Sequence, residues 1–321
     1  MSKRRPRRRD SQLRNQRRRL FLEPLEDRRV LAVDAFDDFA APEALVSTSE
    51  DSAIINVGAA YEATITGDNP LIYWRLGDAV KTAGSTAANL GTLGAAGNGT
   101  YQFVVNDVTD SAVFGNTAAN FGTTNATGTT GDGVRVNLTS AFPSSAFTFE
   151  GWYRGNIVGE QTVVSFADPG QSNEMLMIAQ GGTLRGFIDG QSIDTSIPQG
   201  ELLDGEWHHL AVTWTNAGGA YRVYLDGELR FSGSLKSGNN LSVSGSLMLG
   251  QEQDSPGGGF ANTQKFTGDI DEFALYGSAL DAATIREHFL AGRNLFANDT
   301  ATGGDTINLA SFDATSANGA A

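Results

Sequence analysis

Two of the three histidines in this 321-residue chain, His208 and His209, are adjacent, and a pair of imidazoles is a candidate metal site. Successive residues of a β-strand point to opposite faces, so these two side chains cannot bind one ion together unless the strand is bulged there. The sequence therefore favours packing or hydrogen-bonded histidines over metal ligands. We expect the nearby Trp207 and Trp214 to anchor a core or an interface.

A second candidate for chemistry is the segment Gly268–Phe273, which holds Asp269, Asp271 and Glu272. It resembles the carboxylate strand of laminarinase-type glycosidases, in which a nucleophile, an orienting Asp and an acid project from one strand face at alternating positions. Retaining hydrolysis needs two carboxyl groups about 5–5.5 Å apart. Alternation from Asp269 reaches Asp271 and then Phe273, so the acid position is apolar. We therefore expect no catalytic residues in this strand.

The apolar residues of the same strand change phase between Ile270 and Phe273. A β-bulge at Asp271-Glu272 would return the apolar residues on both sides to the core and would re-aim a carboxylate. Asp271 is then either a structural carboxylate bonded to backbone N–H groups or a ligand for a hard cation such as Ca²⁺, which prefers clustered oxygens. These residues alone leave both interpretations open.

Around this strand, short β-branched and aromatic runs recur between Gly/Asn/Asp clusters from about Leu71 to Leu290. Many short strands at such spacing are typical of a sandwich or barrel, and two packed sheets are the natural solution. The sequence thus predicts an all-β fold. The expected strands are Ile72–Leu76, Val134–Leu138, Phe147–Tyr153, Thr162–Phe166, Met175–Ala179, Leu184–Ile188, His208–Thr215, Tyr221–Leu225, Leu229–Ser232, Leu247–Leu249 and Phe266–Tyr276.

One helix is expected near the end of this region. Asp281 can cap it, Leu280 and Ile285 occupy the positions of a hydrophobic staple, and Gly292 can end it. Ile285 and Phe289 share a face at spacing i, i+4. We expect that face to dock on the sandwich.

The turn at Asp226-Gly227 allows two hairpin registers. A two-residue turn would pair Leu225 with Glu228 and mix charge into the core. A three-residue loop over residues 226–228 pairs Leu225 with Leu229 and Val223 with Phe231 instead. The sequence favours the three-residue loop.

Composition excludes several classes of function. Of the 23 basic and 37 acidic residues, residues 1–32 hold 12 and 4, which leaves 11 and 33 for the rest of the chain. So acidic a body is not a general nucleic-acid binder, because phosphate affinity needs a basic face. The chain has no cysteine, and no apolar run approaches the ~20 residues of a membrane-spanning helix. No phosphate loop or dinucleotide fingerprint is present either, and Gly257-Gly258-Gly259 is interpreted as a loop.

The segments outside the β-rich region differ in composition from it. Residues 1–32 are basic and expected to be disordered; by charge alone they are either a solvated arm or an export signal, although they lack the apolar region of a signal peptide. Within them, Leu22–Leu31 resembles the LEPR-XLL motif of large bacterial surface proteins, which implies export. Residues 33–69 are expected to be an acidic linker or partial repeat, and residues 292–321 a flexible tail or truncated following repeat.

A resemblance covers the region in between, residues 70–291. The series Tyr73–Asp78, Phe147–Tyr153, Gly205–Thr213, Tyr224–Gly227 and Gly268–Tyr276 is similar in order and spacing to a laminin G-like, concanavalin A-like domain. That family implies an antiparallel two-sheet jelly-roll sandwich that usually binds glycans or proteins, often with Ca²⁺, and it does not imply catalysis. Calcium ligands in the family often come from the first strand and from the Ile-Asp-Glu strand, which correspond to Asp78 and Asp271.

The resemblance therefore predicts a non-enzymatic extracellular or cell-surface binding and adhesion module for a glycan or protein, with Ca²⁺ as its implied cofactor, no nucleic-acid partner and no transmembrane segment. Two alternatives are kept. One is a divergent polysaccharide-active glycoside hydrolase of the same fold, and the other is an architectural spacer in a surface protein. The ligand and the oligomeric state are not determined by the sequence.

Overall fold

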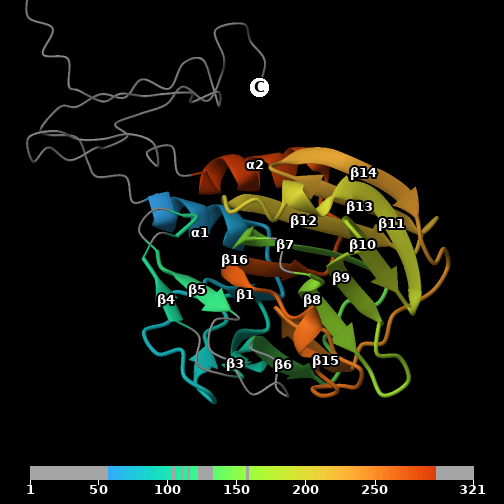
Figure 1. Cartoon of the computed structure of the whole chain (residues 1–321), viewed down its shortest axis with the longest axis horizontal. Coiled ribbons are helices and arrows are strands. Elements are labelled where there is room, and N and C mark those ends of the chain that lie inside the picture. Colours follow the sequence, from blue (N-terminus) through green and yellow to red (C-terminus); the bar gives the residue numbers. More distant parts are fainter. Residues whose placement is uncertain are drawn as a thin grey trace, which may run out of the picture.

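The computed structural model describes residues 57–102, 106–109, 111–113, 116–121, 133–156 and 159–293. The basic segment 1–32 and nearly all of the tail 292–321 lie outside the described residues, so the expectations for their order stay predictions. Within the described residues the fold is mostly β, with two short α-helices (Figure 1).

The strands form two eight-stranded sheets in which every paired strand is antiparallel. The first, sheet A, has the order β14-β13-β12-β7-β16-β5-β4, with β1 also paired to β16, and the second, sheet B, has the order β11-β10-β9-β8-β15-β6-β3-β2. The two-sheet sandwich expected from the sequence is confirmed. Sheet A comprises β1 (Ile72–Trp74), β4 (Asn106–Val108), β5 (Ala118–Phe121), β7 (Ala146–Gly155), β12 (His208–Thr215), β13 (Ala220–Leu225), β14 (Glu228–Ser234) and β16 (Gly268–Tyr276), and sheet B comprises β2 (Thr86–Ala87), β3 (Gly99–Tyr101), β6 (Val134–Leu138), β8 (Gln161–Ala167), β9 (Met175–Gln180), β10 (Thr183–Ile188), β11 (Gln191–Pro198) and β15 (Gly245–Leu249).

All eleven expected strands are present, and the structure adds β2, β3, β4, β5 and β11. Four of the added strands have two to four residues, and β11 reads Gln-Ser-Ile-Asp-Thr-Ser-Ile-Pro with few apolar residues. Short or polar strands carry too little alternation to be recognised from the sequence.

The core lies between the sheets and is built from apolar side chains on the inner face of each. Phe142 and Phe166 stack with ring centroids 3.6 Å apart, and Trp214 lies 5.9 Å from Phe147. Trp214 is therefore the core anchor that the sequence predicts. Its indole also donates a 2.8 Å hydrogen bond to the carbonyl of Leu235, which satisfies the one polar atom it buries.

The β13–β14 hairpin has the turn that the sequence analysis rejected. Asp226 and Gly227 have φ of +52° and +73°, the left-handed pair of a two-residue turn, and Leu225 pairs with Glu228. A bulge further along the hairpin then restores the expected pairing of Val223 with Phe231. The bulge, and not a longer loop, keeps charged side chains out of the core. The expected register was therefore wrong at the turn, where Leu225 pairs with Glu228, and agrees with the structure at Val223, which pairs with Phe231.

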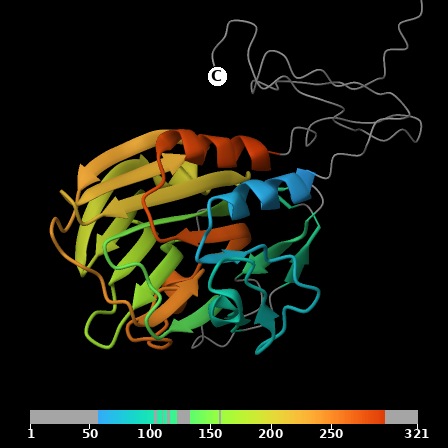
Figure 2. The ribbon, with the colours of Figure 1, turned by 180° about the vertical axis from the view of Figure 1, so that it is seen from behind.

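Two helices, α1 (Val57–Gly67) and α2 (Ala282–Gly292), lie side by side on the outer face of sheet A (Figure 2). The helix α2 is the expected one: Asp281 caps it by accepting a 2.9 Å hydrogen bond from the Thr284 N–H, and Ile285 is buried against Tyr224.

The helix α1 falls in the stretch expected to be a linker or partial repeat. Its Tyr61 and Ile65, four residues apart, are fully buried against the sheet and α2. The helix α1 therefore packs on the sandwich ahead of the boundary at residue 70 that the sequence suggests.

Candidate functional site

The Asp271-Glu272 segment of β16 is bulged, as the phase of its apolar residues predicts. The register between β16 and β7 shifts between Asp271 and Ala274, and Glu272 has a φ of +54°. Ile270 and Phe273 on the two sides of the bulge both belong to the core between the sheets. As a result Asp271 and Glu272 are both fully buried outside that core, on the face of sheet A that α1 covers.

Each Asp271 carboxyl oxygen accepts a hydrogen bond. One oxygen accepts from the Ala112 N–H at 3.2 Å and the other from Asn116 Nδ2 at 3.0 Å. Asn116 Nδ2 also donates to Glu272 Oε1 at 2.9 Å and to the carbonyl of Arg75 at 3.0 Å, so three oxygens surround this nitrogen. Burial and the neighbouring Glu272 charge raise the pKa of Asp271.

Glu272 is paired with a cation that the protein supplies itself. Arg75 donates to Glu272 Oε1 from Nη2 at 3.0 Å and from Nε at 3.1 Å, and the Tyr73 hydroxyl donates to the other oxygen. Arg75 also reaches Glu62 of α1 at 2.8 Å. Burial raises the pKa of Glu272 to about 7 against the opposing effect of Arg75.

The second residue of the predicted calcium pair, Asp78, has different partners. Its Oδ1 accepts from the Ala88 N–H at 3.1 Å and its Oδ2 from the Tyr101 hydroxyl at 2.9 Å, and it shares no hydrogen-bond partner with Asp271. Both Asp271 oxygens accept hydrogen bonds and Glu272 is paired with a guanidinium. These carboxylates therefore do not present a set of free oxygen ligands for Ca²⁺. In the described ranges no group of three or more His, Cys, Asp or Glu side chains could hold a metal ion. The Asp78–Asp271 site stays a prediction.

The remaining carboxylate of β16, Asp269, is held by a polar surface cluster. Arg154 Nε donates to it at 2.8 Å, Asn120 donates to its other oxygen, and the Arg154 guanidinium lies 4.7 Å from the centre of the Trp207 ring. Phe273, at the position where the glycosidase motif has its acid, is buried in the core. The position at which the glycosidase motif has its acid is therefore apolar and buried in this strand.

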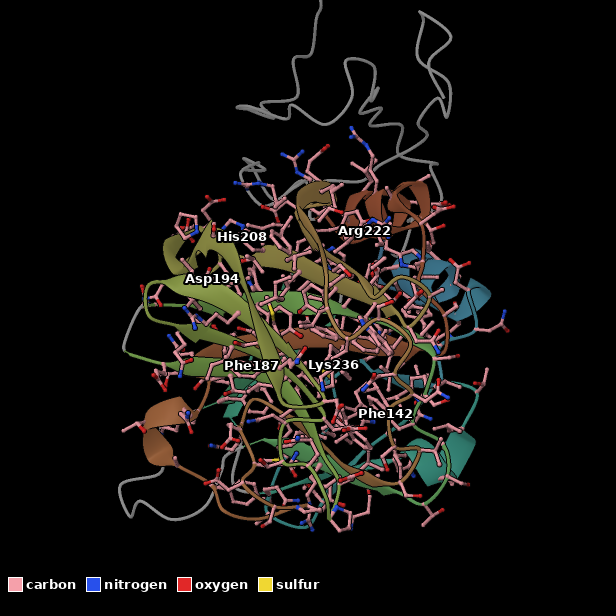
Figure 3. The ribbon with its side chains drawn as sticks, turned by 90° about the vertical axis from the view of Figure 1, so that its right-hand side faces the viewer. Phe142, Phe187, Asp194, His208, Arg222 and Lys236 are labelled. Carbon is pink, nitrogen blue, oxygen red and sulfur yellow. The ribbon has the colours of Figure 1, made fainter. Side chains whose placement is uncertain are left out.

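The adjacent histidines point to different environments, as strand alternation predicts. His208 lies at the periphery of the molecule (Figure 3), where its Nδ1 is 2.8 Å from Asp226 and its Nε2 is 3.1 Å from Asp204. His209 is fully buried and packs against Trp152 and Phe289 with ring centroids 5.2 and 6.2 Å away. Neither arrangement offers a shared metal site.

A different acidic pair, Glu252 and Asp254, was missed by the sequence analysis. It lies in the loop that follows β15, which folds back over the outer face of sheet B. Gln253 holds the loop there: its amide nitrogen donates at 3.0 Å to Ser165 Oγ and to the Ser246 carbonyl, two buried residues of that face.

Glu252 is a largely buried carboxylate. The residue is 4% exposed, and its Oε2 has no hydrogen-bond partner among the described residues. Burial and the nearby Asp254 charge raise the pKa of Glu252 to about 7, against the lowering effect of a hydrogen bond from the Gln253 backbone. Burying a carboxylate is costly, so one with a perturbed pKa is a candidate functional group.

The rest of the loop keeps Asp254 beside it. Ser255 and Gly258 form a bridge, and Gly257 and Gly259 have φ of +70° and +73°, which only glycine adopts without strain. Gln253 Oε1 accepts from the Gly257 N–H at 2.8 Å. A buried carboxylate, Glu252, and an exposed one, Asp254, thus lie in the same loop, and carboxylate oxygens are the type of ligand that a hard cation such as Ca²⁺ prefers. The signal in the sequence was the polar run Gln251–Asp254 directly after an apolar strand.

Comparison with known proteins identifies the domain. Residues 127–286 match the family described as the concanavalin A-like lectin/glucanases superfamily, and residues 16–35 match a family described as planctomycete extracellular. The chain is 37% identical over 143 residues to the neuronal pentraxin receptor of Homo sapiens, an alignment that covers 44% of this chain and 28% of that protein. It is 34% identical over 154 residues to the sushi, von Willebrand factor type A, EGF and pentraxin domain-containing protein 1 of Rattus norvegicus, covering 47% and 4%.

The chain spans between 4% and 35% of the length of the curated relatives that it matches. Among solved structures, the heptameric SAP-like pentraxin of Limulus polyphemus is 21% identical with a TM-score of 0.44, covering 52% of this chain and 78% of that chain. The binding domain of botulinum neurotoxin serotype D is 12% identical with a TM-score of 0.49, covering 70% and 52%. Residues 127–286 of this chain therefore match the concanavalin A-like lectin/glucanases superfamily, and the antiparallel two-sheet fold agrees with the laminin G-like resemblance.

Proposed function

We propose that this protein is a non-enzymatic extracellular binding module that recognises a glycan or a protein, and that the loop carrying Glu252 and Asp254 is its calcium-assisted binding site. One observation carries the proposal: a carboxylate oxygen of Glu252 is buried without a partner beside a second carboxylate. A divalent cation would compensate both charges and could offer its remaining coordination positions to hydroxyl or carboxylate groups of a ligand.

The placement of the loop supports this proposal. The helices α1 and α2, where the folded body begins and ends, cover the outer face of sheet A, whereas the Glu252 loop covers the outer face of sheet B. The two faces are on opposite sides of the sandwich (Figure 1). The site therefore lies on the side of the sandwich opposite α1 and α2, the first and last described elements. This placement is expected for a module that presents a binding site to its ligand.

Two alternative functions are less well supported. A polysaccharide hydrolase would need an acid where this strand has Phe273, and Glu272, the carboxyl group beside Asp271, is paired with Arg75. An architectural spacer would have no reason to bury an unpaired carboxylate. Calcium bound by Asp78 and Asp271 remains a rival location for the ion.

The test is a screen of the full chain against glycans and extracellular proteins, with calcium and with EDTA. We expect binding that EDTA abolishes and that Glu252→Gln weakens at least tenfold. Glu206→Gln, a change at an exposed residue after η2 (Gln199–Glu201), is the matched control and should bind like the wild type. Binding that ignores both EDTA and Glu252→Gln would place the ligand site elsewhere.

We further propose that the protein is exported and acts outside the cell or on its surface. The match of residues 16–35 to a planctomycete extracellular family and the acidic composition of the body support this. No helix in the described ranges is long and apolar enough to cross a membrane. A reporter fused to residues 1–35 should leave the cytoplasm of a planctomycete host; full retention would contradict the proposal.

A further inference from the structure

A buried cluster of ionisable groups joins both helices to sheet A. At its centre, Glu150 of β7 is fully buried, and its Oε1 accepts from the Tyr276 hydroxyl at 2.6 Å and lies 2.7 Å from Nδ1 of His288 on α2. The other nitrogen of His288, Nε2, is 2.8 Å from Oδ2 of Asp68, the residue that follows α1. One imidazole thus bridges α2, the sheet and the end of α1.

This geometry determines the charge of His288. A neutral imidazole has one N–H and one lone pair, so one nitrogen would face a carboxylate oxygen without a proton between them. Both contacts are satisfied only when both nitrogens carry protons. Burial alone would lower the pKa of His288, but the charge of Glu150 and hydrogen bonds to Glu150 and Asp68 raise it to about 9.

The other groups facing this site do not replace that charge. His209 of β12 is fully buried, with Nε2 3.4 Å from Glu150 Oε2, a longer and weaker contact than the 2.7 Å one from His288, and it does not reach Asp68. Tyr276 donates to Glu150, and burial and Glu150 raise the pKa of Tyr61 on α1. The positive charge between the two carboxylates is therefore that of His288.

The two ends of His288 differ in their freedom. Glu150 is fully buried and cannot withdraw, whereas the Asp68 side chain is 43% exposed and can turn to water. Four residues after His288, at the C-terminal end of α2, Gly292 approaches Tyr61 so closely that an added Cβ would lie 2.6 Å from its ring. The helices are therefore antiparallel, with His288 holding one end of the contact and Tyr61 the other.

We propose that His288 is a protonation-controlled clamp, which as an imidazolium holds the end of α1 to α2 and sheet A, and which releases Asp68 when it loses its proton. Because α1 and α2 are the two ends of the folded body, the clamp links pH to how the domain is joined to the rest of its chain.

The sign of the pH dependence follows from the two groups. The stabilisation from the raised histidine pKa is fully present below the unfolded value of about 6.5 and is lost as pH rises through about 9. Glu150, whose pKa is lowered by His288 against the effect of burial, contributes above about pH 4.5 and loses this only in strong acid. His288 is therefore expected to hold Asp68 most strongly between about pH 4.5 and 6.5, and to release it as the pH rises through about 9.

The experiment uses spin labels, because the chain has no cysteine of its own. Labels at Ala63→Cys on α1 and Glu287→Cys on α2, both exposed positions, report the distance between the helices by pulsed EPR. We expect one narrow distance at pH 6 and a broadened or longer distribution at pH 9.5, where about a quarter of His288 stays protonated. Circular dichroism at each pH checks that the sheets remain folded.

Two variants and a control make the test specific. His288→Gln should broaden the distribution already at pH 6, whereas His208→Gln, which also removes an imidazole held between two carboxylates, should behave like the wild type. If His288→Gln does not fold, Asp68→Asn keeps the Glu150 pair and should move the transition to lower pH. A wild-type distribution that is identical at both pH values, or a transition that Asp68→Asn leaves in place, would overturn the clamp.

Discussion

Arg75 Nη2 lies 3.0 Å from Glu272 Oε1, joining the first strand of the sandwich to its last across 197 positions of the sequence. The laminin G-like resemblance led us to expect a calcium ion between these two strands. In this chain the guanidinium supplies the positive charge at the β16 bulge, and the same side chain reaches Glu62 of α1. The bulge is therefore a structural centre that ties β1, β16 and α1 together.

The first prediction concerns this ion pair. Arg75→Met should lower the free energy of unfolding by about 3–5 kcal/mol, because it leaves the buried Glu272 carboxylate without its partner. Arg286→Met, which removes the exposed partner of Glu228, should cost at most about 1 kcal/mol. Urea denaturation measures both. Equal losses would show that Glu272 is not held as described.

The second prediction tests the corrected hairpin and the docking of α2. Gly227→Ala should destabilise more than Gly238→Ala, by about 1–2 kcal/mol. Both glycines have positive φ, but a Cβ at Gly227 would meet the Phe289 ring at 3.0 Å, whereas one at Gly238 would meet nothing within 4 Å. Thermal unfolding gives the comparison. Equal costs for the two changes would mean that α2 does not press on the turn.

The third prediction concerns the start of the folded body. Removing residues 1–56 should leave stability unchanged, whereas removing residues 1–69 should lower it by several kcal/mol. The larger deletion uncovers the sites of Tyr61 and Ile65, and each such buried side chain contributes about 1.5–3 kcal/mol. Limited proteolysis of the full chain should therefore leave a core that begins near residue 57. A stable core that begins at residue 70 would contradict the role of α1.

The fourth prediction is the lack of hydrolysis. The chain should not turn over β-glucans or galactans, because Phe273 occupies the acid position and Asp269 is paired with Arg154. Reducing-sugar release is the measurement. Activity that disappears in both Asp269→Ala and Asp271→Ala would support the hydrolase alternative instead.

The sequence predicted those features that depend on local patterns. The phase change between Ile270 and Phe273 was enough to predict the β16 bulge, and Asp281 with its staple was enough to predict α2. The helix α1 was not predictable in this way, because Val-Gly-Ala-Ala-Tyr-Glu-Ala-Thr-Ile-Thr-Gly has only a short apolar face. It is stabilised by tertiary contacts of Tyr61 with residues far along the chain.

The candidate binding loop was missed for a similar reason. Gln251, Glu252 and Gln253 are polar, and the sequence analysis made no prediction for them, but all three are buried because the loop folds back on sheet B. Only the hydrogen bonds of Gln253 to Ser165 and Ser246 reveal this. The calcium hypothesis came from a resemblance; its first location, Asp78 and Asp271, stays a prediction, and the Glu252 loop is the location that we propose.

The most direct test of the proposed binding site compares calcium binding by the wild type with calcium binding by two single variants, one at Glu252 and one at Asp271. Calorimetric titration of the full chain with calcium, together with its melting midpoint in calcium and in EDTA, should show binding that stabilises the wild type by about 2.7 kcal/mol at a hundredfold excess over Kd. Glu252→Gln should lose the heat and the stabilisation, and Asp271→Asn should retain both even though its own stability falls. A wild type that ignores millimolar calcium, or an effect that Asp271→Asn removes and Glu252→Gln keeps, would contradict the assignment of the binding site to the Glu252 loop.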